Sequence, residues 1–461
     1  MSRQLRATTG VLAAAALVAG TMAVVGTSTA HAAPTCNGKP VTKVIDEDES
    51  DAEHEGTEGD DVVLLKGSAI YAYFANGGDD TVCVEAYSVE VTGDAGDDWI
   101  SAELTETTAA IDGGPGDDTI IGSNIDEDDG WDELYGGPGS DKIDGLDGDD
   151  EIFADRSMWS DDVTDDAADE IRGGDGDDLV TASTMPADKT AGSDRLIGGA
   201  GSDTLSIDGR KTTLNVPDET VRASSGGPVD TFTGFGSFTT SASADIEGTE
   251  DRDRFTVLGP DSTLEAKGGN DRIDIGGKNA TIRAGDGADE VAFYAPGKKN
   301  QVRLGDGDDR IQFAGSLGVT VKAGKGDDRF DLRTHGDLGE GPGEYDHLFP
   351  MRATLLGKSG IDTLTWDCKS KVDAGDGTLD CSHKSGKINF GGMQVYKAGR
   401  AEPWKDVFHG SSRRDVFYGG GKNDEMYGHR GNDRLVGGKG DDIAFGGKGR
   451  DSCTAEREHG C

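Results

Sequence analysis

The sequence has little positive charge and few aromatic residues. Across 461 residues, 45 Lys and Arg stand against 89 Asp and Glu, which gives a formal net charge of −44, and 6% of the residues are aromatic. So acidic a chain has no affinity for nucleic-acid phosphates or anionic membrane surfaces. Its carboxylates repel one another when the chain is compact, so the charge predicts a cationic partner.

Long apolar runs are also scarce. The run from Val11 to Val25 is shorter than the roughly 20 residues that span a bilayer. Arg3 and Arg6 precede it, and Ala30-His31-Ala32 follows as a small-residue cleavage site, an order typical of a secretory signal peptide. We therefore predict a signal peptide over residues 1–32, cleavage after Ala32, a secreted extracellular protein and no membrane insertion.

Catalytic motifs are missing too. The nearest match to the HExxH zinc-protease motif, His54 to Glu58, lacks the second histidine, and Gly357 to Gly360 does not complete a GxSxG hydrolase motif. No stretch without repeats is long enough for an ordinary catalytic domain. We expect no enzyme activity. Two alternatives stay open: an extracellular polysaccharide-active enzyme, or an adhesin with a protein or glycan partner, carried on a calcium-stabilised β-solenoid.

The sequence contains only 6 cysteines, an even number that favours disulfides in a secreted chain. None of their spacings fits the C-x₂₋₄-C pattern of a structural zinc site. Proximity in the sequence suggests the pairs Cys36–Cys83, Cys368–Cys381 and Cys453–Cys461. Other connectivities are compatible with the same six residues.

Glycine and aspartate, in contrast, are abundant and periodic. The pattern G-G-x-G-x-D occurs in strict copies that end at Asp118, Asp141, Asp178, Asp203, Asp442 and Asp451. High charge with 34% hydrophobic residues also describes disordered chains. An apolar residue stands two positions after the aspartates of these copies and of near-copies such as the one that ends at Asp98, as at Ile100, Ile120 and Val180, and this favours a folded chain instead.

The spacing of the aspartates differs between regions. From Tyr418 to Cys453 they recur every nine residues, whereas Asp253, Asp271 and Asp289 are 18 apart. The intervening units keep the apolar residue, such as Leu264, and lack the aspartate. If one coil takes two units, only one side of these 18-residue coils carries complete loops, and the C-terminal array carries them on both sides.

Each unit divides into six turn residues and three strand residues. Glycines permit the positive φ or the close backbone approach of a tight loop and leave its carbonyls free. The sixth-position aspartate adds a carboxylate, and the eighth residue faces the interior. Because Ca²⁺ takes six to eight oxygen ligands at about 2.3–2.6 Å, stacked loops can share one ion, and Mg²⁺ with its stricter octahedral geometry fits less well.

These units resemble the RTX, or haemolysin-type, calcium-binding repeat, whose signature is G-G-x-G-x-D-x-U-x. The resemblance implies an all-β fold, a parallel β-roll or β-solenoid of nonapeptide repeats with two nonapeptides per coil and Ca²⁺ in the turns. It also implies a secreted calcium-binding protein, structural or surface-associated. The chain departs from many such proteins in its N-terminal signal and in lysines inside the loops, namely Lys325, Lys439 and Lys448.

The resemblance implies calcium ligands among the sixth-position aspartates and the carbonyls of the first- and fourth-position glycines. The aspartates are Asp61, Asp80, Asp98, Asp118, Asp141, Asp150, Asp178, Asp203, Asp271, Asp289, Asp309, Asp328, Asp424, Asp433, Asp442 and Asp451. The glycines are Gly113, Gly116, Gly136, Gly139, Gly173, Gly176, Gly198, Gly201, Gly437 and Gly440. At the degenerate loops of Asp253, Asp406 and Asp415 we expect ordinary turns.

We expect six segments along the chain. They are the signal peptide 1–32, an N-terminal repeat region 33–205, a repeat-poor segment 206–251, a central region 252–330 with 18-residue coils, a second repeat-poor segment 331–405, and a C-terminal nonapeptide array 406–461 with a disulfide-capped end. Both repeat-poor segments are long enough to hold strands or an insertion, and Thr231–Ser241 favours β structure. No amphipathic helix pattern is found after the signal peptide.

Overall fold

The computed structural model describes residues 34–46, 52–67, 70–87, 90–105, 107–125, 130–158, 167–184, 192–209, 211–225, 228–293, 299–313, 317–332, 352–366, 370–381, 386–398 and 405–461. The predicted signal peptide lies outside these residues. Every regular element within them is a strand. None of the described segments is a helix long and apolar enough to cross a membrane.

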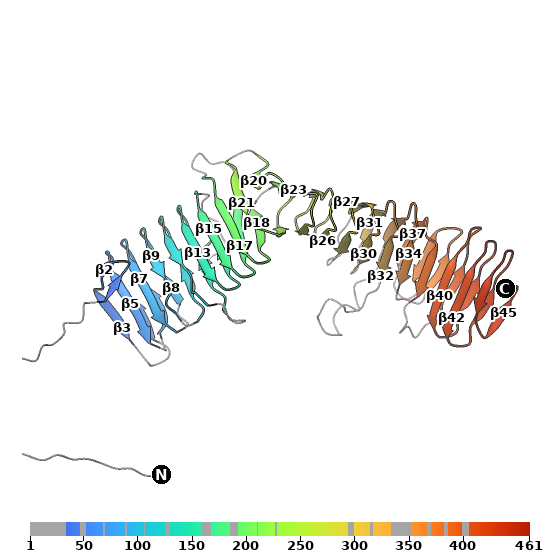
Figure 1. Cartoon of the computed structure of the whole chain (residues 1–461), viewed down its shortest axis with the longest axis horizontal. Helices are drawn as coiled ribbons and strands as arrows, with labels where there is room; N and C mark the ends of the chain where they lie inside the picture. The colour runs from blue at the N-terminus through green and yellow to red at the C-terminus, as the bar shows by residue number, and fades with distance from the viewer. Residues whose placement is uncertain are drawn as a thin grey trace, which may run out of the picture.

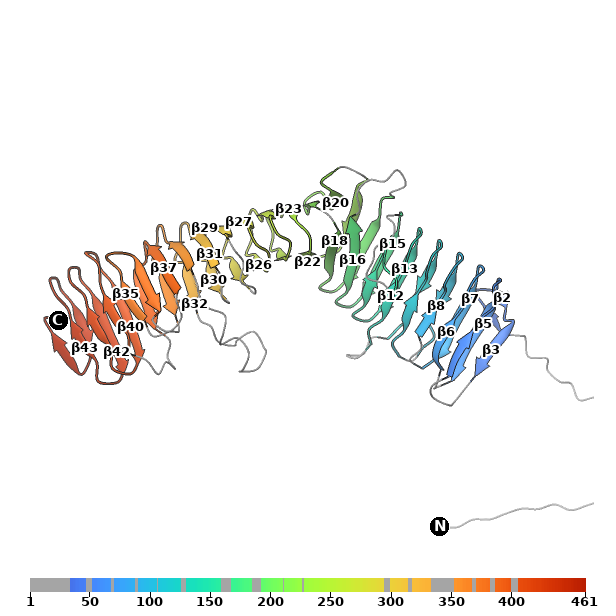
Figure 2. The same ribbon diagram turned by 180° about the vertical axis from the view of Figure 1, so that it is seen from behind.

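Two long sheets extend through the whole described chain, and Figures 1 and 2 show them as an elongated stack of coils. Sheet 1 consists, in spatial order, of β3 (Lys43–Asp46), β5 (Val62–Gly67), β7 (Thr81–Ala86), β9 (Trp99–Ser101), β11 (Thr119–Ile121), β13 (Lys142–Asp147), β15 (Glu170–Asp175), β17 (Arg195–Ala200), β21 (Asp230–Thr233), β20 (Thr220–Ala223), β19 (Thr212–Asn215), β23 (Ala244–Glu247), β25 (Thr263–Glu265), β27 (Thr281–Asp286), β29 (Gln301–Asp306), β31 (Leu317–Lys322), β33 (Arg352–Leu356), β37 (Gly386–Gly391), β36 (Thr378–Cys381), β35 (Ser370–Asp373), β39 (Val407–His409), β41 (Glu425–Tyr427), β43 (Ile443–Phe445) and β45 (Arg457–His459).

Sheet 2 faces sheet 1 across the core. Its strands are β4 (Ala52–Glu55), β6 (Ile70–Phe74), β8 (Glu90–Thr92), β10 (Ala110–Asp112), β12 (Glu133–Tyr135), β14 (Glu151–Phe153), β16 (Leu179–Thr184), β18 (Thr204–Gly209), β22 (Ser237–Thr240), β24 (Arg254–Val257), β26 (Arg272–Ile275), β28 (Glu290–Phe293), β30 (Arg310–Phe313), β32 (Arg329–Leu332), β34 (Thr363–Trp366), β38 (Val395–Ala398), β40 (Val416–Gly421), β42 (Arg434–Lys439) and β44 (Ser452–Thr454).

Consecutive strands alternate between the two sheets over most of the chain. β9 pairs in parallel with β7 and β11, while β10 pairs in parallel with β8 and β12. Each coil therefore adds one strand to each sheet, with a turn between them. The predicted parallel β-roll with two repeat units per coil is confirmed.

The core lies between the sheets as one continuous apolar cluster. The residues two positions after the repeat aspartates, such as Ile100, Ile120 and Val180, are fully buried in it. Near the C-terminal end Phe408 of sheet 1 stacks on Phe417 of sheet 2, with ring centroids 4.4 Å apart. The eighth position of the repeat thus faces the interior, because a side chain there stands on the inner face of its three-residue strand.

Two antiparallel strands interrupt the parallel order of sheet 1. β20 lies between β19 and β21, and β36 lies in the same way between β35 and β37. At the first site sheet 1 has three strands between β17 and β23, whereas sheet 2 has only β22 between β18 and β24. Two extra strands lengthen one face by about 10 Å. The stack changes direction at this place, near β20 and β23 (Figure 1).

Disulfides lie at both ends of the described stack. Cys36 of the N-terminal hairpin β1 (Thr35–Cys36) and β2 (Lys39–Pro40) is bonded to Cys83 of β7, and Cys453 of β44 is bonded to Cys461. These two predicted pairs are confirmed. The third, Cys368–Cys381, lies outside the residues whose side chains the structure describes.

Candidate calcium-binding turns

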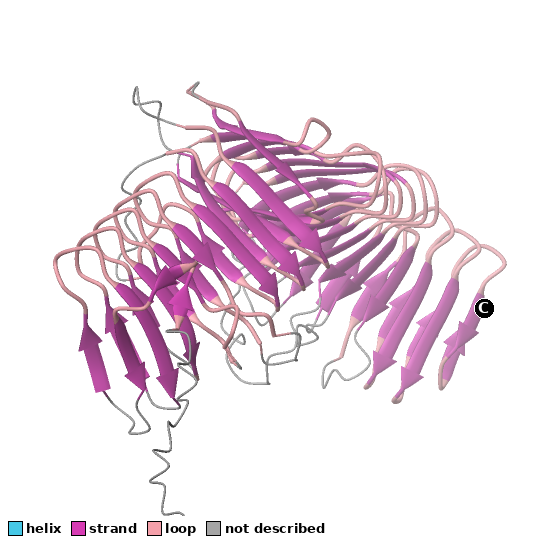
Figure 3. Ribbon diagram, turned by 60° about the vertical axis from the view of Figure 1, so that its left-hand side comes forward, coloured by secondary structure: helices cyan, strands magenta, loops and turns pink. Residues whose placement is uncertain are grey.

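The turns stack in two rows along the edges of the coils (Figure 3). We call the turns that lead into sheet 1 strands edge 1 and those that lead into sheet 2 strands edge 2. In each nine-residue unit, three residues form a strand and their side chains point alternately inward and outward. The other six residues form the turn, so equivalent turn residues lie above one another in successive coils. The sixth-position aspartates consequently form rows.

Within a row, each aspartate is hydrogen-bonded to the next. The backbone N–H of Asp80 donates to Oδ1 of Asp98 at 2.7 Å, and that of Asp98 donates to Oδ1 of Asp118 at 2.8 Å. These side chains are almost fully buried. One carboxylate oxygen is therefore used to satisfy a buried backbone donor, a group that is costly to leave unpaired.

The other carboxylate oxygen, Oδ2, is not used in this way. Among the predicted ligands, Oδ2 is buried and accepts no hydrogen bond from any described residue at Asp80, Asp98, Asp118, Asp150, Asp178, Asp203, Asp271, Asp289, Asp309, Asp424, Asp433, Asp442 and Asp451. A buried, unpartnered carboxylate oxygen is strongly disfavoured unless a cation or a donor reaches it. A regular row of such atoms indicates a ligand that the protein atoms do not supply.

The first-position glycines allow the close approach of these oxygens to the backbone. A Cβ atom on Gly113 would lie 2.4 Å from Oδ2 of Asp118 and 2.7 Å from the carbonyl oxygen of Gly136 in the next coil. The same position is 2.1–2.6 Å from the aspartate Oδ2 at the other predicted first glycines, Gly136, Gly173, Gly198 and Gly437. Glycine at this position therefore lets a carboxylate oxygen and a carbonyl oxygen from successive coils lie close together, and both are oxygen types that bind Ca²⁺.

The fourth-position glycines are needed for the backbone itself. Gly116 has φ +154°, and a Cβ there would lie 1.8 Å from the carbonyl oxygen of Gly96 in the preceding coil. The other predicted fourth-position glycines have φ between 138° and 151°: Gly139, Gly176, Gly201 and Gly440. Only glycine allows the turns to stack this closely.

Burial makes the ionised form of these carboxylates costly. Desolvation, followed by the charges of Asp141 and Asp98, raises the pKa of Asp118 to about 8 against the backbone hydrogen bond from Asp98. Desolvation and then the carboxylates of Asp155 and Asp194 raise the pKa of Asp169 to about 10. A divalent cation between successive carboxylates would offset both shifts in pKa, because it attracts the charged form.

The aspartate rows are distributed unevenly. Along edge 1 they comprise Asp61, Asp80, Asp98, Asp118, Asp141, Asp169, Asp194 and Asp230, and then Asp406, Asp424 and Asp442, which ends on Glu456. Along edge 2 they comprise Asp132, Asp150, Asp178 and Asp203, then Asp253, Asp271, Asp289, Asp309, Asp328 and Asp362, which ends on Gln394, and finally Asp415, Asp433 and Asp451.

The central coils therefore carry a row on edge 2, while the C-terminal array carries rows on both edges, as the 18-residue and nine-residue spacings predict. On edge 1 of the central coils neutral groups take over the same hydrogen bonds. Ser262 Oγ accepts from the N–H of Ala244 at 3.0 Å, and Asn300 Oδ1 accepts from the N–H of Ala280 at 2.9 Å.

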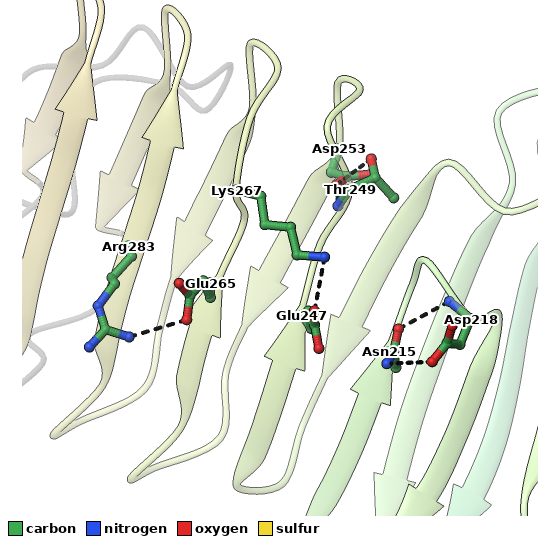
Figure 4. A network of polar contacts seen from close by, with 8 residues as sticks. All are labelled: Asn215, Asp218, Glu247, Thr249, Asp253, Glu265, Lys267 and Arg283. Carbon is green, nitrogen blue, oxygen red and sulfur yellow. Dashed lines mark hydrogen bonds and ion pairs between the residues drawn. The ribbon is translucent and has the colours of Figure 1, made fainter.

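Four rows begin at a turn of a different kind. In each, the second turn residue is Ser or Thr, and its N–H donates to Oδ2 of the sixth-position aspartate: Thr57 to Asp61, Ser123 to Asp132, Thr249 to Asp253, and Ser411 to Asp415. Figure 4 shows one of them, where the hydroxyl of Thr249 also donates to Asp253 Oδ2 at 3.0 Å. In these capped turns a protein donor satisfies Oδ2, the carboxylate oxygen that stays without a donor in most other turns.

Sequence reasoning missed several members of these rows. Asp132, Asp169, Asp194 and Asp230 follow loops that are longer than the repeat or lack its glycines, whereas Asp362 ends a turn that keeps Gly357 and Gly360 but comes 34 residues after Asp328. Asp406 and Asp415 also stand in the rows, although ordinary turns were expected there. The usable signal was an aspartate two residues before a buried apolar residue, as in Asp194 before Leu196, with no requirement for glycine.

A second row, at the fifth turn position, was also missed. Its exposed Asp or Asn side chains accept hydrogen bonds from the next coil, as Asp149 does from the N–H of Asp177 at 2.7 Å and Asn423 from the N–H of Asp441 at 3.0 Å. Lys325 likewise stays outside the buried row, since it is 72% exposed and pairs with Asp306. Fifth-position residues thus hold neighbouring turns together from the solvent side.

The fold and the buried carboxylate rows together define a parallel β-roll with calcium-binding turns. A family model described as the RTX calcium-binding nonapeptide repeat matches residues 74–104, 110–124, 128–156, 163–183, 190–206, 405–435 and 418–453. The chain therefore carries RTX, haemolysin-type, calcium-binding nonapeptide repeats, with Ca²⁺ as a structural ligand.

No match was found among curated proteins. Among solved structures, the chain is similar to one described as the X-ray crystal structure of a hyperactive, Ca²⁺-dependent, β-helical antifreeze protein from an Antarctic bacterium. The two are 15% identical, and the match covers 88% of this chain and 84% of that chain with a TM-score of 0.20. At this TM-score the two backbones do not superpose as whole chains.

Proposed function

We propose that this protein is a secreted, non-enzymatic structural protein of the cell surface or extracellular matrix that folds on calcium. The observation that carries the proposal is the row of buried Oδ2 atoms that accept no hydrogen bond from any described residue and lie beside the first-position glycines. Such a row serves no evident purpose in an apo protein, because neutral side chains such as Asn300 make the same backbone hydrogen bond.

Calcium would act on the whole coil stack. The chain has a net charge of −44, and each bound Ca²⁺ would offset two charges between adjacent coils. Because the stacked turns do not exist in the unfolded chain, the free energy of calcium binding adds to the stability of the folded state. The disulfides at both ends support an extracellular location, where disulfides persist.

The test is a calcium titration of the purified full chain by calorimetry, combined with circular dichroism before and after addition of a chelator. We expect several binding sites per chain, loss of the β-sheet signal on chelation and its return with Ca²⁺. Mg²⁺ at the same concentration serves as the matched control and should not restore the signal, because it binds poorly to flexible all-oxygen sites. An unchanged spectrum after chelation, with no heat of calcium binding, would contradict the proposal.

A further inference from the structure

Two successive turns of edge 1 bring together three aspartates. Asp155 follows β14, in the second position of a turn whose first residue is Ala154, since the carbonyl oxygen of Ala154 lies where that of Gly136 lies in the preceding coil. The strict repeats have glycine in this second position, as at Gly114 and Gly137. A side chain at this position adds a carboxylate that an ordinary turn does not have.

The three carboxylates converge from two successive turns. Asp169 and Asp194 are neighbouring members of the buried row, joined by the hydrogen bond from Asp169 N–H to Asp194 Oδ1 at 3.0 Å. One carboxylate oxygen each of Asp155, Asp169 and Asp194 lies within 4.8 Å of the other two. Oxygens that share one Ca²⁺ at about 2.4 Å are at most about 4.8 Å apart, so a single ion can contact all three.

The burial of Asp169 points independently to a ligand. Its side chain is 3% exposed, its Oδ1 accepts the N–H of Asp141 at 2.8 Å, and its Oδ2 accepts no hydrogen bond from any described residue. Asp155 and Asp194 are as deeply buried, at 2% and 1% exposure. Three like charges gathered away from water repel one another strongly, and a cation is the partner that removes this repulsion.

We propose that Asp155, Asp169 and Asp194 form a three-carboxylate calcium site that binds Ca²⁺ more tightly than the other turns. In those turns successive sixth-position aspartates supply the carboxylates, and carbonyl oxygens complete the shell. Affinity for Ca²⁺ in oxygen sites rises with the number of charged ligands. This site therefore binds Ca²⁺ first as the calcium concentration rises and releases it last as the concentration falls. The inference rests on the proposed function, because it presupposes that the repeat turns bind calcium.

The experiment is a calcium titration of the full chain, by calorimetry in competition with a calcium chelator of known affinity. Wild type should show one site with an affinity on the order of tenfold or more above the main class. Asp155→Asn should abolish that tight site and leave the main class unchanged. Asn keeps an oxygen that can accept the N–H of Ser183, which donates to Asp155 Oδ2 at 3.2 Å, so the variant removes charge with little other change.

Asp177→Asn is the matched control. It removes one negative charge from an exposed fifth-position residue and keeps the oxygen that accepts the N–H of Ser202. It should leave both classes of site unchanged. If Asp155→Asn lacks the wild-type β signal at saturating calcium, Asp155→Gly replaces it, because glycine is the residue of the strict repeats at this position.

The outcomes separate the two claims. Absence of calcium binding by wild type would overturn the proposed function itself. Calcium binding in a single affinity class, or a tight site that survives in Asp155→Asn or Asp155→Gly, would overturn the three-carboxylate site and leave the proposed function standing.

Discussion

The central coils and the C-terminal array have the same coil geometry and different turn chemistry. From β24 to β32 a buried aspartate row follows edge 2 only, and on edge 1 Ser262 and Asn300 accept the equivalent backbone hydrogen bonds. From β39 to β45 aspartates line both edges. A turn of this roll can thus stack without a carboxylate. The carboxylates are therefore explained by what they bind and not by the hydrogen bonds that they accept.

The two regions also differ in how their outer faces are held. In the central region, ion pairs link neighbouring coils on the side of sheet 1, from Lys267 to Glu247 at 2.9 Å and from Arg283 to Glu265 at 3.4 Å (Figure 4). Such exposed pairs contribute little, typically about 0–1 kcal/mol each. The main difference between the regions therefore remains their calcium-binding turns, and it can be tested directly.

The largest expected effect is on regional stability after calcium removal. Hydrogen exchange followed by mass spectrometry should show that chelation lowers protection in residues 405–461 about 100-fold or more, which corresponds to about 2.7 kcal/mol for ligand at 100 times its Kd. Protection in residues 254–293 should fall less, because only one edge loses its ions. Equal losses in the two regions would show that the neutral turns of edge 1 depend on calcium as well.

One substitution in the C-terminal array should destabilise the protein in the presence of calcium and stabilise it in its absence. Burial, and then the charges of Asp406 and Asp442, raise the pKa of Asp424 to about 8, so its ionised form is costly without a cation. Asp424→Asn keeps an oxygen for the N–H of Asp406, 2.9 Å away, and removes the charge. In the presence of calcium, we expect hydrogen exchange in residues 416–445 to show that the variant is destabilised by about 1–3 kcal/mol.

In chelator the same variant should be more stable than wild type by on the order of 1 kcal/mol, since folding no longer has to bury or protonate this carboxylate. Asp424→Ala is the companion variant. It leaves the N–H of Asp406 without its acceptor and should be destabilising in both conditions. Destabilisation of Asp424→Asn by the same amount with and without calcium would indicate a purely structural role for this carboxylate.

The smallest expected effect concerns the capped turn that begins the central row. Asp253 Oδ2 is satisfied by the N–H of Thr249 at 2.7 Å, whereas Oδ2 of Asp271 in the next coil accepts no hydrogen bond from a described residue. Asp253→Asn should therefore change calcium affinity by less than about threefold, and Asp271→Asn should lower the affinity of its site about tenfold or more. Calorimetric titration of the two variants side by side makes the comparison. Similar losses would mean that capped turns bind calcium too.

Much of the fold and of the site was predictable because the repeat is a local rule. A tight turn of six residues and a strand of three impose glycine, aspartate and an inward apolar residue at set positions, so the buried Ile120 and the ligand types follow from the repeat itself. The resemblance to the RTX repeat adds the parallel roll. The 18-residue spacing of Asp271 and Asp289 likewise predicted a row on one edge.

Insertions between repeat units interrupt this regular spacing. The aspartates that follow an insertion could therefore not be assigned to a row from the sequence. Asp141, Asp169 and Asp194 are 28 and 25 residues apart and yet occupy neighbouring positions in the row, since extra residues between two strands change the interval along the chain without changing the distance in space. The antiparallel strands β20 and β36 have no repeat signature at all, because their position depends on pairing with strands already in the sheet.

The sequence by itself determined that the chain coils into a two-sheet roll with calcium ligands in its turns, because nine-residue units dictate their own local geometry. Only the tertiary structure decided which turns are capped by Ser or Thr, where extra strands bend the stack, and that Asp155 joins Asp169 and Asp194. These features depend on contacts between coils, and the stacking distance between coils brings together residues that no sequence interval relates.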